Sequence, residues 1–587
     1  DTVVLLNRTV PLVQFLMEEP LPSSVDVVVV GTGLGEAMLA AAAARSGCSV
    51  LHLDDCTFYG GEWASFNLRS IDEWTERQEK RQRGEDEIPP EPSAPLIKEG
   101  ETLIRIRRRP TIRNLTDQWT EASSGSSFAA AAVEPAAVNE DGGDSALPPP
   151  LPPPTWREAM DDQWRRFSID ISPKVLLSRG DLVRTLCDSE VSAYAEFKLV
   201  DRLLGVTSSE SSIDIHRIPC SRGEIFDSES LSMLDKRRLM KLLQLCMQWH
   251  AAPDQCESVQ EAIDTPFVEF LATQNIQGAL ADLLLHSLSF LSPAGVSPAT
   301  GASLRALCRF MDSVGVFGPS PFLVPLYGSG ELPQCFARLC AVFGGIYCLG
   351  RPVDGIVERE GRVAAVLVAG QRVECGHILL TSAFSPDQWT NTDSQSTVSR
   401  SILIANGSVK QEGKESISLL NLGGLAPGEG ARMLETGWEA CTAPKGYFVA
   451  QLTVEGEGKR ELVDDVIEKM YAVREKGGEE EGEGEKKEEK PLLLRRIEWE
   501  QVEHPANYSV PSNVGVLRLP DATADYRSVM EEAKSLFARF WPDRDFLPRS
   551  LKKEQQEEEP FDAREGDDEG KEEGDNKEKE EEKGDSQ

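Results

Sequence analysis

Residues 26–54 read DVVVVGTGLGEAMLAAAAARSGCSVLHLD, and they carry the clearest structural signal in the chain. Val27–Val30 is an unbroken β-branched run, which is typical of a parallel strand buried on both faces. Gly31-Thr32-Gly33 suits a tight turn, the alanine-rich run Glu36–Arg45 favours a helix, and Ser49–Leu53 is a second apolar strand. This order predicts a β–α–β unit and therefore an α/β fold.

The turn also begins like the dinucleotide fingerprint G-x-G-x-x-G, in which Gly31 and Gly33 would let the backbone approach a pyrophosphate. Asp54 ends the second strand, where such folds carry the acid that binds the ribose. Yet Glu36 occupies the third glycine position, and Glu62 stands where flavin amine oxidases carry an arginine. Both carboxylates would repel a pyrophosphate at the helix N-terminus. The sequence therefore predicts a FAD/NAD-binding-like fold with a vestigial site and no cofactor.

The composition excludes several classes of protein. A net charge of −36 disfavours a nucleic-acid partner, because phosphates would be repelled. The 12 cysteines form no CxxC pair and the 6 histidines form no ligand cluster with them. We therefore expect free thiols in a reducing compartment and no metal site. No apolar run reaches the roughly 18 residues that span a bilayer, so we expect a cytosolic chain.

Changes in composition divide the chain into segments. A proline run at 148–154 indicates disorder, and apolar residues at helical spacing over 230–249, 276–290 and 303–314 indicate a block of helices. The segments that we expect are the first part of the α/β domain at 1–68, a disordered low-complexity insert at 69–155, the α/β domain continued at 156–224, an inserted all-helical domain at 225–318, the completed α/β domain at 319–549 with an acidic loop at 476–490, and a disordered acidic tail at 550–587.

Four sequence blocks carry a more specific signal. They are GTGLGE at 31–36, YGGEWAS at 59–65, SRG at 178–180 followed by YAEFK at 194–198, and PFLVPLYG at 321–328 followed by GELPQ at 330–334. In this order the blocks resemble the superfamily of Rab escort proteins and Rab GDP-dissociation inhibitors. The family form of the first block is Gly-Thr-Gly-Leu-x-Glu, so Glu36 is the expected residue there.

Within this superfamily the chain is more similar to the escort proteins. The insertion between Trp63 and Phe167 is typical of escort proteins and absent from the inhibitors, which usually carry serine in place of Trp63. The run at 219–222 with the following Phe226 also has the escort form. The resemblance implies a protein that binds GDP-loaded, unprenylated Rab GTPases and presents them to the Rab geranylgeranyltransferase α/β heterodimer. Such a protein then shields the geranylgeranyl lipid, delivers the Rab by transient membrane contact, and has no catalytic residue of its own.

The resemblance also assigns roles to particular residues. The positions that dock the transferase are Phe226 and Arg237. The lipid is expected between the apolar helices at 230–249 and 276–290. The Rab-binding positions are Tyr59, Glu331, Gln334, Arg338 and Cys348, the last of which replaces a family methionine.

Simpler roles for these residues stay open. Phe226 could be a core residue and Arg237 a solvated helix residue. Tyr59 could be a packed loop aromatic, and Glu331 and Arg338 could form one internal ion pair. For the whole chain, the near alternative is a Rab GDP-dissociation inhibitor that works without the transferase. The distant alternative is a flavin-dependent oxidoreductase, which the two carboxylates at the vestigial site oppose.

Overall fold

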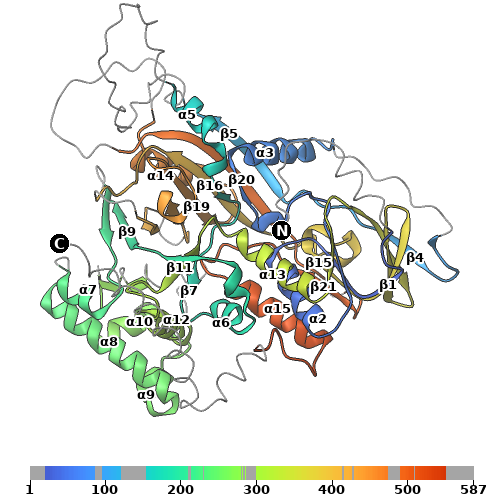
Figure 1. Ribbon diagram of the computed structural model, residues 1–587. Helices are drawn as coiled ribbons and strands as arrows, with labels where there is room; N and C mark the ends of the chain where they lie inside the picture. Colours follow the sequence, from blue (N-terminus) through green and yellow to red (C-terminus); the bar gives the residue numbers. More distant parts are fainter. Residues whose placement is uncertain are drawn as a thin grey trace, which may run out of the picture.

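The computed structural model describes residues 20–549 apart from 86–95, 121–153, 209–212, 229–230, 279, 282–283, 286–298, 413–415, 426–428, 474–489 and 508. Two eight-stranded sheets form its frame, and a block of helices lies at one end (Figure 1). There are also two smaller sheets, β7-β11-β8 and β3-β6. Their strands are β3 Ser65–Phe66, β6 Ile169–Asp170, β7 Leu176–Leu177, β8 Phe197–Leu199 and β11 Phe322–Pro325.

The first large sheet contains the predicted β–α–β unit. Its order is β12-β2-β1-β15-β14-β13-β4, and β21 also pairs with β15. β1 runs parallel to β2 and to β15, which confirms the unit predicted from residues 26–54. The strands are β1 Ser24–Val30, β2 Val50–Leu53, β4 Thr102–Arg105, β12 Ile346–Cys348, β13 Val353–Arg359, β14 Arg362–Val368, β15 Gln371–Thr381 and β21 Val514–Leu517.

Three helices pack together against this sheet. Helix α2 (Leu34–Arg45) is buried from Leu34 to Ala44, and its small side chains let α13 (Glu331–Val342) and α15 (Arg527–Phe540) pack against it. Because α2 lies between β1 and β2 in the sequence, its N-terminus meets the carboxyl ends of both strands. This junction is where an α/β sheet of this kind places a ligand.

The second large sheet has the order β10-β9-β17-β18-β19-β16-β20-β5. It shares one core with α14 (Arg460–Met470) and another with α3 (Leu68–Gln82) and α5 (Trp156–Asp162). The strands are β5 Ile112–Trp119, β9 Arg202–Ser208, β10 Ile213–Arg217, β16 Ser396–Ala405, β17 Ser418–Gly424, β18 Arg432–Thr436, β19 Phe448–Glu455 and β20 Leu493–Glu503.

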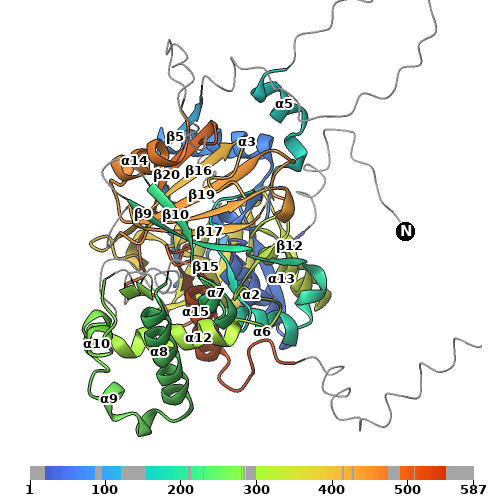
Figure 2. The same cartoon turned by 90° about the vertical axis from the view of Figure 1, so that its left-hand side faces the viewer.

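The helical block lies at the end of the molecule opposite α3 and α5 (Figure 2). Its helices are α7 Arg222–Asp227, α8 Met233–Ala251, α9 Glu257–Gln260, α10 Phe267–Thr273 and α12 Thr300–Ser313. The helix expected over 276–290 falls partly outside the described residues, and the domain boundaries at 225 and 318 stay predictions. Among the described residues, no helix is long and apolar enough to cross a membrane.

The prediction that residues 69–155 are a disordered insert is wrong for the parts that the structure describes. Residues 68–82 form α3, which buries Ile71 and Trp74. The side chain of Asn67 caps its N-terminus by accepting hydrogen bonds from two backbone N–H groups of the first turn. β4 and β5 are the edge strands of the two sheets, where they pair with β13 and β20. The proline run, most of the acidic loop and the acidic tail lie outside the described residues. β4 and β5 are ordered because they pair with strands more than 200 residues away in the sequence, which local composition does not indicate.

Candidate functional site

The vestigial nucleotide site lies at the junction of β1, β2 and α2. Both the backbone N–H and the hydroxyl of Thr32 donate to Asp54 Oδ2, at 2.8 and 2.6 Å. Glu36 is 3% exposed, and a Cβ atom on Gly33 would lie 2.5 Å from Glu36 Oε2. The backbone surface that a pyrophosphate would approach is thus covered by two carboxylates of the chain itself.

The cation missing from the sequence block at 59–65 comes from another segment. Arg108 follows β4, and its guanidinium donates to Glu62 Oε1 at 2.8 Å and to Asp55 Oδ1 at 2.7 Å. Arg81 of α3 adds a second ion pair to Asp55, at 3.3 Å. We call Arg108, Asp55 and Glu62, with the adjacent Asp54, the buried charge cluster. Sequence reasoning missed it, although the alternation of apolar and polar residues over 104–107 is a strand signal that would have placed Arg108 in an ordered segment.

Electrostatics agree with this pairing. Burial alone would raise the pKa of Glu62, but the Arg108 guanidinium lowers that pKa below its ordinary value. Burial also opposes ionisation of Asp55, yet Arg108 and Arg81 lower its pKa to about 2. Burial dominates at Glu36, where no cation is in contact, and raises the pKa of its carboxyl to about 8. Glu62 and Asp55 are therefore ionised near neutral pH, whereas burial raises the pKa of Asp54 to about 7 and leaves Glu36 mostly protonated.

These residues do not fit a dinucleotide. The cavity that remains between the glycine turn and the cluster measures about 10 Å³, which is less than the space of a single small ligand. Its walls include Glu36, Asp54 and Glu62. A pyrophosphate there would meet carboxylates and would have to displace Glu62 from Arg108.

The raised pKa of Glu36 predicts a pH-dependent stability. Between pH 4.5 and about 8 the folded chain keeps a proton on Glu36 that the unfolded chain has released, so the free energy of unfolding falls as pH rises through this window. Each unit of pKa difference corresponds to about 1.4 kcal/mol. Glu36→Gln is expected to unfold at higher urea concentration than wild type at pH 8 and to differ less at pH 5. Equal pH slopes for the two proteins, measured by urea titration, would contradict this prediction.

The five predicted Rab-binding residues lie along α13 and the edge of the first sheet. The ring of Tyr59 lies 5.9 Å from that of Tyr347, and the carbonyl of Cys348 accepts from the backbone N–H of Asp54 at 3.1 Å. The structure therefore brings Tyr59 and the β12 strand of Cys348 together at the sheet edge.

The other three residues follow one another along α13, which leads into β12. Glu331 is the first residue of the helix, where a carboxylate suits the helix dipole. Gln334 donates to the carbonyl of Gly330 at 3.1 Å, and the guanidinium of Arg338 lies 4.3 Å from the centre of the Tyr194 ring. In the part of the chain that the structure describes, Glu331 and Arg338 do not pair with each other. The internal ion pair considered above is therefore wrong, and both charges stay available to a partner. We call Tyr59, Glu331, Gln334, Arg338 and Cys348 the platform.

The two residues predicted to dock the transferase lie on neighbouring helices. Phe226 on α7 is 59% exposed, and its carbonyl accepts from Lys236 Nζ of α8 at 2.7 Å. Arg237 on α8 is also exposed. The alternative that Phe226 is a core residue is therefore wrong. An exposed phenylalanine beside an exposed arginine is the composition of an interface hot spot.

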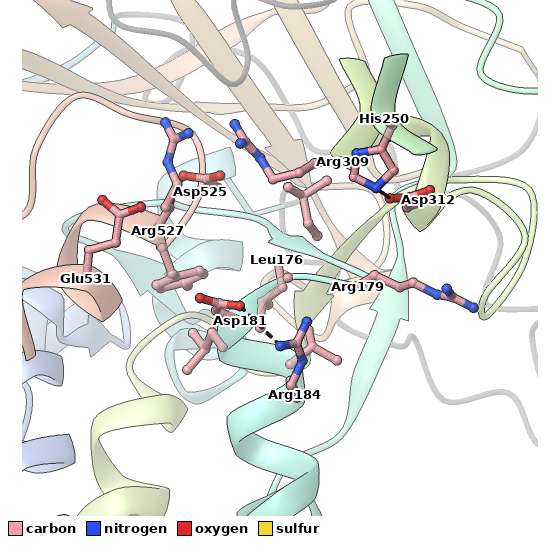
Figure 3. A pocket seen from close by; sticks show the side chains of 15 residues that line it. Leu176, Arg179, Asp181, Arg184, His250, Arg309, Asp312, Asp525, Arg527 and Glu531 are labelled. Carbon is pink, nitrogen blue, oxygen red and sulfur yellow. Dashed lines mark hydrogen bonds and ion pairs between the residues drawn. The ribbon is translucent and has the colours of Figure 1, made fainter. Parts of the chain in front are cut away.

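A cavity of about 510 Å³ lies between the helical block and the α/β part (Figure 3). Arg309 and Asp312 enter it from α12, while Arg527 and Glu531 enter it from α15. Its remaining charged lining includes Arg184, which pairs with Asp181 of α6 (Asp181–Asp188). Isoprenoid chains need apolar walls, so this cavity is not the expected lipid slot. The buried leucines of α8 pack in the core with α10 and α12, so a slot there would require these helices to separate.

Comparison with known proteins agrees with this architecture. The family model "GDP dissociation inhibitor" matches residues 18–87 and 155–422, and a second model, "RAE1/2 domain I, C-terminal region", matches 398–522. The segment between the two matched parts of the first model, 88–154, contains Arg108. The crystal structure of a Rab GDI from Plasmodium falciparum shares the fold, with a TM-score of 0.62, 18% identity, and coverage of 89% of this chain and 99% of that one.

Curated relatives match over nearly the whole chain. "Rab proteins geranylgeranyltransferase component A 1" of Caenorhabditis elegans is 41% identical over 92% of this chain and 97% of the relative. The human protein of the same name is 30% identical over 91% and 93%. "Guanosine nucleotide diphosphate dissociation inhibitor 2" of Arabidopsis thaliana is 24% identical over 74% and 80%. The chain therefore belongs to the GDP dissociation inhibitor family, in the group of the Rab geranylgeranyltransferase component A proteins.

Proposed function

We propose that this chain is a Rab escort protein. It binds GDP-loaded, unprenylated Rab GTPases, presents them to the Rab geranylgeranyltransferase α/β heterodimer, shields the attached geranylgeranyl groups and delivers the Rab to membranes. The observation that carries the proposal is the 41% identity to a component A protein over 92% of the chain. The inhibitor alternative rests on weaker similarity, 24% identity over 74% of the chain.

The chain itself supplies binding and presentation rather than chemistry. The place where related folds hold a redox cofactor is filled by Glu36 and the buried charge cluster, so the oxidoreductase alternative has no support from the site. The platform and the exposed Phe226 lie on different parts of the fold, on α13–β12 and on α7. This separation lets one molecule hold a Rab and a transferase at once.

Presentation works through effective concentration. The Rab cysteines lie on a flexible tail. When one chain binds the Rab and the transferase together, the encounter of the thiol with the transferase becomes intramolecular. This raises the overall avidity by about 10²–10⁴-fold. The geranylgeranyl product must then be kept from water, since each buried CH₂ group contributes about 0.8 kcal/mol. The apolar helical block is the part of the chain suited to that task.

The first test is binding of a Rab in its two nucleotide states. Wild type is expected to bind the GDP-loaded Rab more tightly than the GTP-loaded form, measured by fluorescence titration of a labelled Rab. Arg338→Ala removes a platform cation and is expected to weaken GDP-Rab binding by about 10-fold or more, as for an interface hot spot. Arg359→Ala, an exposed arginine on β13, is the matched control and should bind as wild type. Equal affinity of wild type and Arg338→Ala would remove the platform from the proposal.

A further inference from the structure

One exposed tryptophan stands out from the rest of the chain. All ten tryptophans lie in the described ranges, and among them only Trp438 is exposed, with 44% of its surface accessible. The guanidinium of Arg166 lies 5.3 Å from the centre of its ring, and Arg166 is exposed as well. Exposed tryptophan and arginine side chains are enriched at the centres of protein interfaces, where a cation over an indole gains further energy on desolvation.

The backbone around this pair is held in an unusual conformation. Tyr327 and Cys441 have φ angles of +65° and +57°, in the left-handed region that residues other than glycine seldom adopt. Hydrogen bonds fix both, because the N–H of Tyr327 donates to the carbonyl of Ala440 at 3.1 Å and that of Cys441 to the carbonyl of Trp438 at 3.0 Å. The hydroxyl of Ser168 donates to the carbonyl of Tyr327. Strain that the surrounding structure maintains in this way is common at binding sites.

The strained segment is continuous with the platform. Tyr327, which is exposed, is followed by a glycine turn, and the N–H of Glu331 donates to the carbonyl of Gly328 at 3.4 Å. We call Arg166, Tyr327 and Trp438 the Trp438 surface. It joins three distant parts of the sequence to the first turn of α13, where the platform begins.

An interface with a Rab must include more residues than the five of the platform. A stable protein–protein interface covers roughly 20–30 residues on each side, whereas the platform has only five. A globular GTPase seated on α13 must therefore cover neighbouring surface, and the Trp438 surface adjoins that helix. Arg166 also provides an exposed cation on a chain whose net charge is −36. The surface of the partner that binds this cation should therefore be acidic or rich in carbonyl oxygens.

We propose that the Trp438 surface is a second contact for the GDP-loaded Rab, with Trp438 packing on an apolar side chain of the GTPase and Arg166 binding a carboxylate. This proposal rests on the proposed function and adds Arg166 and Trp438, which lie outside the four family blocks. The partner that binds this surface is the globular Rab. The alternative partner is a second copy of the chain, and the experiment below distinguishes the two.

The experiment measures the dissociation constant of the full chain for a GDP-loaded Rab. Trp438→Ala is expected to raise it by about 10- to 100-fold and Arg166→Glu by about 10-fold, with the thermal midpoint unchanged. Val268→Ala, on α10 and equally exposed at 44%, is the control and should bind as wild type. Because Arg166→Glu alters only an exposed side chain, it keeps the test decisive if Trp438→Ala lowers the thermal midpoint.

The possible outcomes separate this inference from the proposed function. If wild type binds the Rab and both variants bind it equally well, the inference is overturned and the proposed function stands. If wild type itself binds no Rab, the proposed function fails, and the inference fails with it. If Trp438→Ala abolishes self-association in sedimentation velocity while Rab binding is unchanged, the surface belongs to a second copy and the inference is overturned.

Discussion

Phe226→Ala is expected to weaken binding of the Rab-loaded chain to geranylgeranyltransferase by about 30- to 1000-fold, which corresponds to the 2–4 kcal/mol of an aromatic hot spot. The side chain is 59% exposed on α7 and contributes nothing to the core, so its removal should leave the fold intact. Transfer of geranylgeranyl to the Rab should fall in parallel, because the enzyme no longer finds the presented substrate. Surface plasmon resonance with immobilised transferase measures the first effect and a labelled-lipid assay the second.

Another exposed apolar residue of the same block provides the matched control. Met247 on α8 is 52% exposed, and Met247→Ala should bind the transferase as wild type does. Rab binding should be equal for wild type and both variants, because the platform lies on other elements. A Phe226→Ala chain that supports transfer at the wild-type rate would place the docking surface elsewhere.

Arg108→Ala is expected to lower the free energy of unfolding by about 3–5 kcal/mol, because breaking a buried ion pair leaves its partner carboxylates unpaired. The guanidinium contacts Glu62 and Asp55 directly and lies 3.9 Å from Asp54 Oδ1. Arg107→Ala removes the exposed neighbouring arginine and should change stability little. Urea unfolding followed by tryptophan fluorescence measures both variants.

Neutralising the acids together with the cation gives the complementary result. The triple variant Arg108→Met, Glu62→Gln and Asp55→Asn should recover most of the lost stability, since a buried ion pair replaced by neutral side chains of similar volume is often close to neutral. If Arg108→Ala and Arg107→Ala were equally stable, the cluster would have no structural role in closing the vestigial site.

The β–α–β unit of the first sheet was predictable from sequence because β1 contains a continuous apolar run and α2 is rich in alanine. Val27–Val30 and the alanine-rich α2 each indicate one structure, and the observed elements agree within two or three residues of the predicted bounds. α3 was not predicted, because only a narrow stripe of apolar residues, Leu68, Ile71 and Trp74, marks its buried face among many charges. β4 and β5 are edge strands whose partners lie far away in the chain; a brief alternation over 104–107 marks β4, whereas β5 consists mostly of polar residues and has no strand pattern of its own.

The site was predictable in part for a similar reason. The glycine turn, Glu36 and Glu62 are read from two compact blocks, and they indicated that the nucleotide site is vestigial. Arg108 was missed because it lies 46 residues from Glu62, in a segment whose composition suggested disorder. Trp438 was missed as well, since its exposure depends on how three separate segments meet and no local pattern marks it.

Geranylgeranyl transfer in a reconstituted system tests the escort function most directly. Purified transferase α/β heterodimer, a GDP-loaded Rab and labelled geranylgeranyl diphosphate are mixed with and without this chain. The escort function predicts that label reaches the Rab only when the chain is present. Transfer at the same rate without the chain, or no transfer although the chain binds prenylated Rab and extracts it from membranes, would contradict it.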